Sequence, residues 1–380
     1  MAKGDISAVI DSLVFRADYA TYPSIIHVSG DVFAIAYIGP DNDGYVSTIE
    51  IDAAGNIGAA LIDTLEFDTA ACGFPKIYHL TGSIFAVVYS GTSADGFICT
   101  FSIDAAGNIS NAVLDVYDFD VHADAGGSLA HVTGNIYAIA FTGYLNDGFI
   151  ITLSIDAAGN IAAAETDRLE FDTDLGYYPF LLQVDTGTFA IAHQGTDSDG
   201  FVRSVEIDIS GNIAAAVTDT LEFDTTYATS PKLLHVTGDV FAIAYTADSD
   251  VGKIVTFTIS AAGDISNSVI DTLTFEPDNA TLTSFIALST DLFAVAYQGP
   301  TAHGFIVTFT IDASGNISNA ILDSFEFETS NCTQTTICHV SGDVYAIAYS
   351  NSTFDGTLIT LSIQTEEDLA PQLLLLLGVG

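Results

Sequence analysis

The sequence predicts an all-β protein built from seven tandem copies of one four-stranded unit. Two markers carry this prediction, and both recur every 52 residues. The first is an aromatic residue inside phrases such as GDVFAIAY, found at Phe33, Phe85, Tyr137, Phe189, Phe241, Phe293 and Tyr345. The second is a glycine that opens the following run, from Gly44 to Gly356. Such a fixed period indicates that one structural unit is repeated along the chain.

Each unit consists of four short runs with the composition of β-strands. Within residues 231–276 these runs are PKLLHV, VFAIAY, KIVTFTIS and ISNSVIDTLTF. They are rich in Val, Ile, Thr and Phe, and turn-forming residues separate them. The turn after the third run usually reads Asp-Ala-Ala-Gly-Asn, as at residues 52–56. No stretch shows helical periodicity, so we expect strands throughout.

Four strands per unit at a period near 50 residues are the signature of a β-propeller blade. The chain therefore resembles the β-propeller superfamily along almost its full length. It has no Trp, so the WD dipeptide is absent, and the sialidase box is absent too. The strand-turn phrasing is only loosely similar to YVTN-type repeats. The resemblance implies one seven-bladed domain over residues 1–365, followed by an apolar tail at 366–380, and it implies no particular function.

The N-terminal segment is predicted to close the ring. Residues 6–15 read ISAVIDSLVF, which matches the fourth run of other units with one residue deleted, whereas the seventh unit lacks a fourth run. We therefore expect residues 5–15 to complete the blade of residues 333–363 and to cover its open edge. Acidic residues at equivalent places on the outer strands would discourage edge-to-edge pairing with other molecules: Glu66, Asp118, Glu170, Glu222 and Glu326.

The tail has three interpretations. Its apolar run at residues 373–377 is far shorter than the roughly 20 residues needed to cross a bilayer. Residues 371–380 are instead expected to self-associate with another subunit, to cover one blade, or to begin a truncated anchor. The opening MAKGDIS contains no apolar signal region.

Charge excludes two classes of function. The 380 residues include 7 Lys and Arg against 49 Asp and Glu, a formal net charge of −42. So few cations cannot neutralise a nucleic-acid backbone, and they cannot form a basic surface for anionic lipid. The cations are spread along the chain, so no clustered arginine pocket is expected: Lys3, Arg16, Lys76, Arg168, Arg203, Lys232 and Lys253.

The two faces of a propeller differ in this sequence. The turns between strands one and two, and between three and four, lie on one face, which we call the uniform face. The connections from strand four to strand one, and from two to three, lie on the other, which we call the loop face. The same turn begins at Asp52, Asp104, Asp156, Asp208 and Asp312, whereas the loop-face segments diverge between repeats. Either short turns are more constrained than loops, or the loop face is specialised for an asymmetric ligand.

Aromatic and acidic residues on the loop face are the candidate ligand-binding residues. Aromatic rings beside carboxylates suit a protein or carbohydrate ligand. The residues are Tyr177, Tyr178, Asp197 and Asp199 in the fourth unit, with Tyr22, Asp41 and Asp43 in the first. The loops at 41–44 and 197–200 faintly resemble the calcium hairpins of integrin-type propellers. Each offers two carboxylates, whereas calcium needs six to eight oxygen ligands. We therefore expect no cofactor and keep calcium as a minor alternative.

Other chemistry-bearing residues favour structural roles. His27, His79, His131, His235 and His339 share one repeat position and are expected to bond a neighbouring blade or turn rather than a metal. The sequence has no G-x-S-x-G motif, and its four cysteines form no C-x-x-C pair. No catalytic residue is therefore predicted.

We expect a non-enzymatic propeller, secreted or displayed at the cell surface, that acts as a binding or scaffold module. Its ligand, a glycan, peptide or divalent cation, would bind the loop face. Nucleic acid and membrane insertion are not expected. The alternatives are a hydrolase or lyase acting at the channel mouth, and a structural subunit of a larger extracellular assembly. Sequons at Asn108, Asn279, Asn316, Asn331 and Asn351 would accept glycans if the protein is exported.

Overall fold

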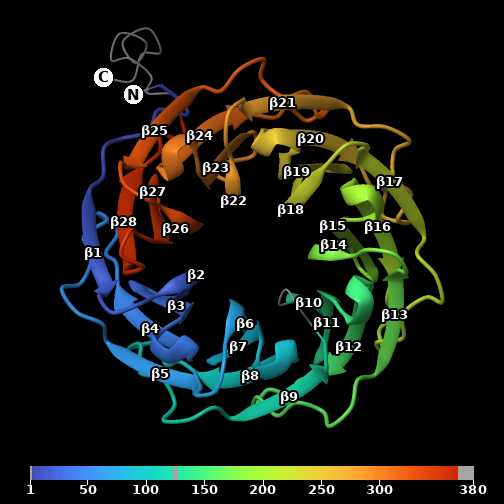
Figure 1. Cartoon of the computed structure of the whole chain (residues 1–380), viewed down its shortest axis with the longest axis horizontal. Helices are drawn as coiled ribbons and strands as arrows, with labels where there is room; N and C mark the ends of the chain where they lie inside the picture. Colours follow the sequence, from blue (N-terminus) through green and yellow to red (C-terminus); the bar gives the residue numbers. More distant parts are fainter. Residues whose placement is uncertain (1, 123–126, 367–380) are drawn as a thin grey trace, which may run out of the picture.

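The computed structural model describes residues 2–122 and 127–366. Seven four-stranded antiparallel sheets are arranged around a central axis (Figure 1). The chain folds as a seven-bladed β-propeller. Each innermost strand faces the axis and each outermost strand lies at the rim, as the repeat predicts. The predicted apolar tail lies outside the described residues from residue 367 onward.

The blades are numbered here in chain order. Blade 1 contains β2 (Thr21–Ser29), β3 (Val32–Ile38), β4 (Gly44–Glu50) and β5 (Asp63–Asp68). Blade 2 contains β6 (Gly73–Thr81), β7 (Ile84–Ser90), β8 (Gly96–Ser102) and β9 (Asp115–Asp120). Blade 3 contains β10 (Gly127–Thr133), β11 (Ile136–Thr142), β12 (Gly148–Ser154) and β13 (Asp167–Asp172). Blade 4 contains β14 (Tyr177–Asp185), β15 (Thr188–Gln194), β16 (Gly200–Glu206) and β17 (Asp219–Asp224).

Blade 5 contains β18 (Ala228–Thr237), β19 (Val240–Ala247), β20 (Gly252–Thr258) and β21 (Asp271–Glu276). Blade 6 contains β22 (Thr281–Ala287), β23 (Leu292–Gln298), β24 (Gly304–Thr310) and β25 (Asp323–Glu328). Blade 7 contains β26 (Thr333–Ser341), β27 (Val344–Ser350), β28 (Gly356–Ser362) and β1 (Asp11–Arg16). The helical segments among the described residues are 3-10 turns in the loops between second and third strands: Pro40–Asn42, Thr92–Ala94, Tyr144–Asn146, Thr196–Ser198, Asp248–Asp250 and Pro300–Ala302.

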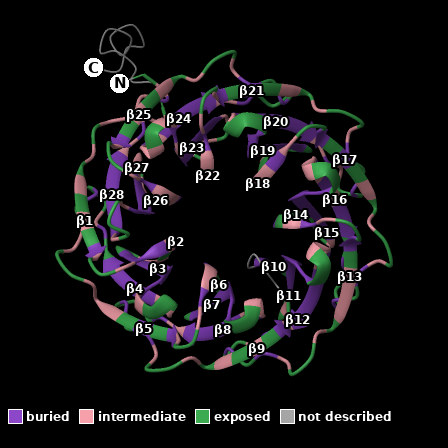
Figure 2. Cartoon of the chain, viewed as in Figure 1, coloured by how far each residue is buried: buried purple, intermediate pink, exposed green. Residues whose placement is uncertain are grey.

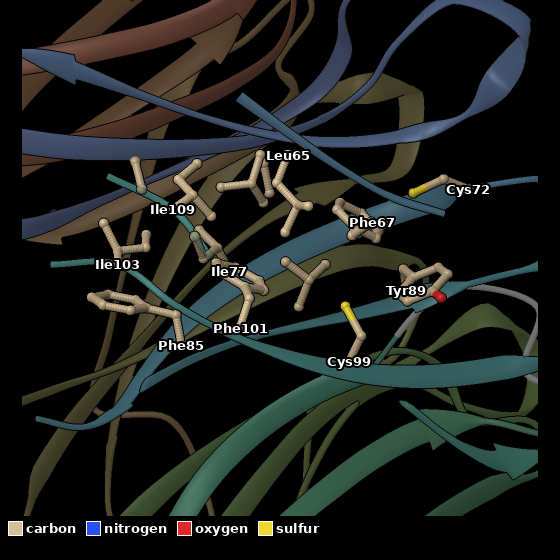
Figure 3. Close-up of a cluster of buried hydrophobic side chains, with 14 of the residues drawn as sticks. Leu65, Phe67, Cys72, Ile77, Phe85, Tyr89, Cys99, Phe101, Ile103 and Ile109 are labelled. Atoms are coloured by element: carbon tan, nitrogen blue, oxygen red, sulfur yellow. The ribbon is translucent and has the colours of Figure 1, made fainter. Parts of the chain in front are cut away.

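The apolar core lies between neighbouring blades. The second strand of a blade is buried on both faces, as β3 illustrates along its whole length (Figure 2). Figure 3 shows the cluster between blades 1 and 2, where Leu65 and Phe67 of β5 pack toward Ile77, Phe85 and other residues of blade 2. A strand that is buried on both faces has apolar residues at consecutive positions, which explains the sequence VFAIAY of the second strands.

The glycine marker of the repeat has a packing cause. Gly44 begins β4, and a Cβ at this position would overlap the ring of Phe67 on β5. The same relation joins Gly148 to Phe171 in blade 3. Because only a residue without a side chain lets this ring lie over the backbone, the spacing between the glycine and the Phe is fixed in each blade.

The N-terminal strand closes the ring, as predicted. β1 pairs antiparallel with β28, from Asp11 opposite Thr360 to Arg16 opposite Gly356. The strand is shorter than the predicted segment 5–15, because its first half forms only an isolated bridge between Ile6 and Ile363. The fourth strands of the other blades are shortened in the same way, as β21 begins at Asp271 rather than at Ile265.

Hydrogen bonds between blades explain why the uniform face is uniform. The Thr48 hydroxyl donates to the Gly107 carbonyl of the next blade at 2.6 Å. The backbone N–H of Ile109 donates to the Asp63 carboxylate of the preceding blade at 2.8 Å. The turns that hold Gly107 and Ile109 therefore carry contacts between blades as well as a reversal of the chain. Uniform turns follow from this structural constraint, so divergence of the loop face is not by itself a sign of ligand binding.

No helix in the described parts of the chain is long and apolar enough to cross a membrane.

Candidate functional site

The two kinds of loop-face segment lie against each other, as the propeller topology requires. The backbone N–H of Cys72, just before β6, donates to the carbonyl of Asn42 in the β3–β4 loop at 2.7 Å. The bond from Cys332 to Ala302 repeats this arrangement at the junction of blades 6 and 7. Each loop before an innermost strand is therefore anchored to the preceding blade, which fixes where that strand enters the ring.

The structure divides the predicted ligand-binding residues into two groups. Asp41 and Asp43 belong to the β3–β4 loop, and Asp197 and Asp199 belong to the β15–β16 loop. Tyr22, Tyr177 and Tyr178 instead lie at the start of innermost strands, nearer the axis (Figure 1). Among the described contacts, none joins the four carboxylates to the three tyrosines. The predicted pairing of rings with these carboxylates therefore has no support in the geometry.

One carboxylate in each of the β3–β4 and β15–β16 loops, Asp43 or Asp199, lies beside a glutamate of the outermost strand. Partial desolvation, then a hydrogen bond with Glu66 and its charge, raise the pKa of Asp43. In blade 4 desolvation and the neighbouring Asp199 raise the pKa of Glu222. Because both members of each pair, Asp43 with Glu66 and Asp199 with Glu222, are carboxylic acids, the two groups either share one proton or repel each other as carboxylates. In blade 6 the repeat replaces the aspartate with His303, whose Nδ1 is within hydrogen-bonding distance of the Glu326 carboxylate.

The tyrosines lie at the loop-face ends of innermost strands. Tyr22 of blade 1 and Phe74 of blade 2 are in edge contact, with ring centroids 4.7 Å apart. Tyr178 of blade 4 lies beside Tyr177 at 5.8 Å and is 39% exposed. Burial raises the pKa of Tyr178, and Tyr22, Tyr177 and Tyr227 contribute to this shift. Tyr22 and Tyr178 occupy one repeat position, at the start of the innermost strands of blades 1 and 4.

A backbone irregularity directs these rings. The first strand of blade 1 has a register shift between Thr21 and Ser24, and Tyr22 within it has a φ of 52°. The equivalent residues Phe74, Tyr178, Ser230 and Gln334 have φ values of 50–54°. Such β-bulges re-aim a side chain at the end of a strand. A positive φ at residues other than glycine is a local cost that the repeat retains at this place.

Two lysines that the sequence analysis did not connect lie two residues further along the same strands. Lys76 on β6 and Lys232 on β18 occupy one repeat position, three units apart, and both are half-buried. The Lys232 ammonium is 5.9 Å from the Phe180 ring centroid and donates to the Ser230 carbonyl at 3.3 Å. Burial lowers its pKa to about 7, and the charge of Lys76 contributes. Burial lowers the pKa of Lys76 to about 8.

The five other cations already have acidic partners. Arg203 donates to Asp172 at 2.5 Å, and Lys253 is 3.2 Å from Asp224. Lys3, Arg16 and Arg168 also form ion pairs with carboxylates. Lys76 and Lys232 have none among the described residues. The sequence does show that the two lysines share one repeat position. It does not show that β6 and β18 lie around the same axis, which depends on closure of the ring (Figure 1).

Apolar residues lie deeper along the same strand face. Residues two positions apart share a face of a strand. Two residues beyond the lysine position stand Ile26, Tyr78, Ala130, Leu182, Leu234, Ile286 and Cys338. They are partly buried and pack against the apolar clusters between blades. The lysines therefore lie between aromatic residues at the loop face and apolar residues below, which accounts for the lowered pKa of each amine.

The recurrent histidines bond their own turns. The Nε2 of His131 lies 2.9 Å from the carbonyl of Gly134, in the turn between the first two strands of blade 3. The same contact joins His27 to Gly30 at 2.8 Å, and it recurs at His79, His235 and His339. Each histidine therefore closes a turn on the uniform face, the structural role expected from the repeat.

Blade 4 contains the one buried histidine–carboxylate contact among the described residues. The ring of His193 is inaccessible to solvent, and its Nε2 lies 3.8 Å from the Asp172 carboxylate. Arg203 donates from Nε to the same ring nitrogen at 3.1 Å, so this nitrogen cannot accept a proton from a substrate. Burial lowers the pKa of His193 to about 4. In blade 5 the equivalent Tyr245 donates to Asp224, so the histidine replaces a structural tyrosine.

The described residues contain no metal cluster at the predicted positions, and a cleft lies on the other face. In the parts of the chain that the structure describes, no group of three or more His, Cys, Asp or Glu side chains could hold a metal ion. Calcium binding at residues 41–44 or 197–200 stays a prediction. A cleft of about 550 Å³ lies instead on the uniform face, lined by residues that include Thr188, Asp208 and Ala261. The Asp208 carboxylate already accepts bonds from Ser210 and Asn212 of its own turn.

Comparisons with known proteins show the fold alone. The periplasmic gluconolactonase PpgL of Pseudomonas aeruginosa is similar over 79% of this chain and 84% of its own, with a TM-score of 0.59 and 15% identity. A protein of unknown function from Dyadobacter fermentans has a TM-score of 0.53 and 9% identity, over 93% and 98% of the two chains. Sqt1 of Chaetomium thermophilum has a TM-score of 0.53 and 12% identity, over 96% and 87%. No family model and no curated protein sequence matches the chain.

Proposed function

We propose that this propeller is a non-enzymatic binding module whose ligand, a carbohydrate or a peptide, occupies the loop-face end of the axis. The observation that carries the proposal is the position of Tyr22 and Tyr178 at the start of two innermost strands, where each ring lies beside a second aromatic ring, that of Phe74 or Tyr177. Tyr178 remains 39% exposed, so its ring is open to a partner. An exposed tyrosine offers a rigid apolar face and a hydroxyl, which suit stacking on a sugar or on an extended peptide.

The site is asymmetric, which suits specific recognition. The repeat position of Tyr22 and Tyr178 holds Phe74, Ser230 and Gln334 in other blades. The Gln334 side chain accepts the backbone N–H of Tyr22 at 3.1 Å, so it supports a neighbour rather than offering a ring. A net charge of −42 keeps such a protein well solvated, and we propose a role outside the cell or at its surface.

A glycan and peptide array tests this proposal. Tyr22→Ser and Tyr178→Ser are the informative variants, because Ser230 shows that the repeat accommodates serine at this φ. Tyr144→Ser is the matched control, since Tyr144 is a 59% exposed aromatic residue in a loop between second and third strands. We expect the first two variants to lose the array signal with little change in melting temperature. Loss in the control alone would place the ligand away from the axis.

A hydrolase acting at the same end of the axis is the second candidate. The observation in its favour is the Lys232 amine, whose pKa of about 7 would let it act as a general base near neutral pH. The structurally similar PpgL is named a gluconolactonase, which makes aldonolactones the first substrates to assay. Lactone opening that is lost in Lys232→Ser, but retained in Lys253→Ser, would favour this candidate.

A further inference from the structure

The lysine position of the innermost strands has a structural occupant in other blades. Three blades place a serine there, and each serine accepts a backbone N–H from the next blade. Ser24 accepts from Ile77 at 3.3 Å, and Ser128 accepts from Leu181 at 3.0 Å. Ser284 accepts from Ile337 at 3.2 Å. The default role of this position is therefore to join neighbouring blades.

Blades 2 and 5 depart from that role at an energetic cost. Lys76 and Lys232 replace the serine, and both amines are half-buried without a carboxylate partner among the described residues. The charge of Lys76 adds to the burial that disfavours the charged form of Lys232. Two half-buried amines without a carboxylate partner oppose folding, because desolvation disfavours a charged group that no opposite charge compensates. A bound anion would supply the missing partner.

The aromatic surroundings indicate what carries this anion. The repeat position two residues before the lysines, toward the loop face, holds aromatic residues at Tyr22, Phe74 and Tyr178. The ring of Phe180 lies beside Lys232. A ligand entering from the loop face would meet rings first and amines next. Rings that flank cations suit a flat polar body with an acidic substituent.

We propose that Lys76 and Lys232 bind the carboxylate of an acidic carbohydrate whose sugar rings stack on Tyr22 and Tyr178. This inference rests on the proposed function and names its ligand class. A monoanionic carboxylate is the simplest partner for these amines, because each amine can donate a charge-assisted hydrogen bond to one of its oxygens. A surrounding protein of net charge −42 disfavours a dianion.

The test uses the full chain and paired ligands. A panel of uronate oligosaccharides is titrated by calorimetry, each beside the neutral oligosaccharide that carries CH2OH in place of the carboxylate. All titrations use about 150 mM salt, which screens the field of the distant acidic residues. At pH 6 the native protein is expected to bind an acidic member at least about tenfold more tightly than its neutral partner, the effect of one charge-assisted hydrogen bond.

The repeat provides the informative variant. Lys76→Ser with Lys232→Ser installs the residue that blades 1, 3 and 6 already hold. This double variant should lose the preference for the acid while keeping an equal or higher melting temperature, because two desolvated amines are removed. Lys3→Ser with Lys253→Ser changes the net charge by the same amount and should keep the preference. In the native protein, the preference should fade as the pH rises from 6 to 9, through the pKa values of about 7 and about 8.

Four results would overturn the inference. Equal affinity for an acidic oligosaccharide and its neutral partner would show that the lysines do not bind the carboxylate. Equal loss of the preference in both double variants would assign it to overall charge. Displacement of the sugar by inorganic phosphate at the same concentration would identify a site for free anions. An array hit that is lost in Tyr178→Ser but carries no acidic group would retain the proposed function and reject the ligand class.

Discussion

The backbone N–H of Ile6 donates to the Asp323 carboxylate at 2.8 Å, and this bond joins blade 7 to blade 6. The same bond, at the same length, joins Ile109 to Asp63 between blades 2 and 1. The Gly4 carbonyl accepts from Thr308 just as that of Gly107 accepts from Thr48. The N-terminal segment is therefore an integral part of the seventh blade, with the junction contacts of an internal repeat.

Equivalent junctions should have equivalent energies. Asp323→Ala and Asp115→Ala each remove a carboxylate that accepts one backbone N–H from the next blade, that of Ile6 or of Ile161. We expect each variant to lose about 1–3 kcal/mol of unfolding free energy, the cost of leaving a partly buried donor unpaired. Denaturant titrations of both variants would check this. A loss in Asp115→Ala with none in Asp323→Ala would mean that the N-terminal segment does not hold the ring closed.

The recurrent histidines should be replaceable. His131→Gln introduces the residue that blade 4 has at the equivalent position, Gln183. The bond that it removes, to the Gly134 carbonyl, is exposed, so we expect a change below about 1 kcal/mol in a denaturant titration. His193→Gln serves as the contrasting variant, because this ring is fully buried and its loss should cost more. A larger loss in His131→Gln, together with release of a bound metal, would contradict the structural role.

The buried His193 should make stability depend on pH. Its pKa is lowered to about 4 in the folded protein, against about 6.5 in the unfolded chain, so the unfolded chain binds the proton more readily. Stability is therefore complete above about pH 6.5 and is lost as the pH falls toward 4. In His193→Tyr, the tyrosine found in other blades replaces this group, and the loss between pH 7 and 4 should shrink by about 1–3 kcal/mol. An unchanged pH profile would show that the ring titrates freely.

The outer carboxyl pairs should oppose folding at neutral pH. The pKa of Asp43 is raised by desolvation and by Glu66, so its contribution to stability falls as the pH rises through the folded pKa. Glu66→Gln should therefore raise the melting temperature by about 1–3 °C at pH 7 in low salt. Glu326→Gln is the matched control, and it should lower the melting temperature because Glu326 faces His303. A calcium-dependent rise in the native melting temperature, lost in Glu66→Gln, would instead identify a cation site.

Periodicity made most of the fold predictable, but it could not locate the site. The repeat of 52 residues sets the number of blades. A Cβ at Gly44 would overlap the Phe67 ring, which explains why a glycine is kept at this repeat position. Lys76 and Lys232 stand far apart in the chain, and only closure of the ring places their strands, β6 and β18, around one axis (Figure 1). Asp41 and Asp197 seemed to belong with the tyrosines because they share the loop face. First strands lie nearer the axis than second and third strands, so the start of a first strand and the loop after a second strand lie at different distances from the axis, which a linear sequence does not show (Figure 1).

A crystal structure of the native protein with its tightest array ligand tests the central claim most directly. The account predicts that the ligand lies at the loop-face end of the axis, with a ring of the ligand or a peptide group against Tyr178 and its acidic group, where present, between Lys76 and Lys232. Density for the ligand in the uniform-face cleft beside Asp208 and Ala261, with the axis unchanged, would contradict it.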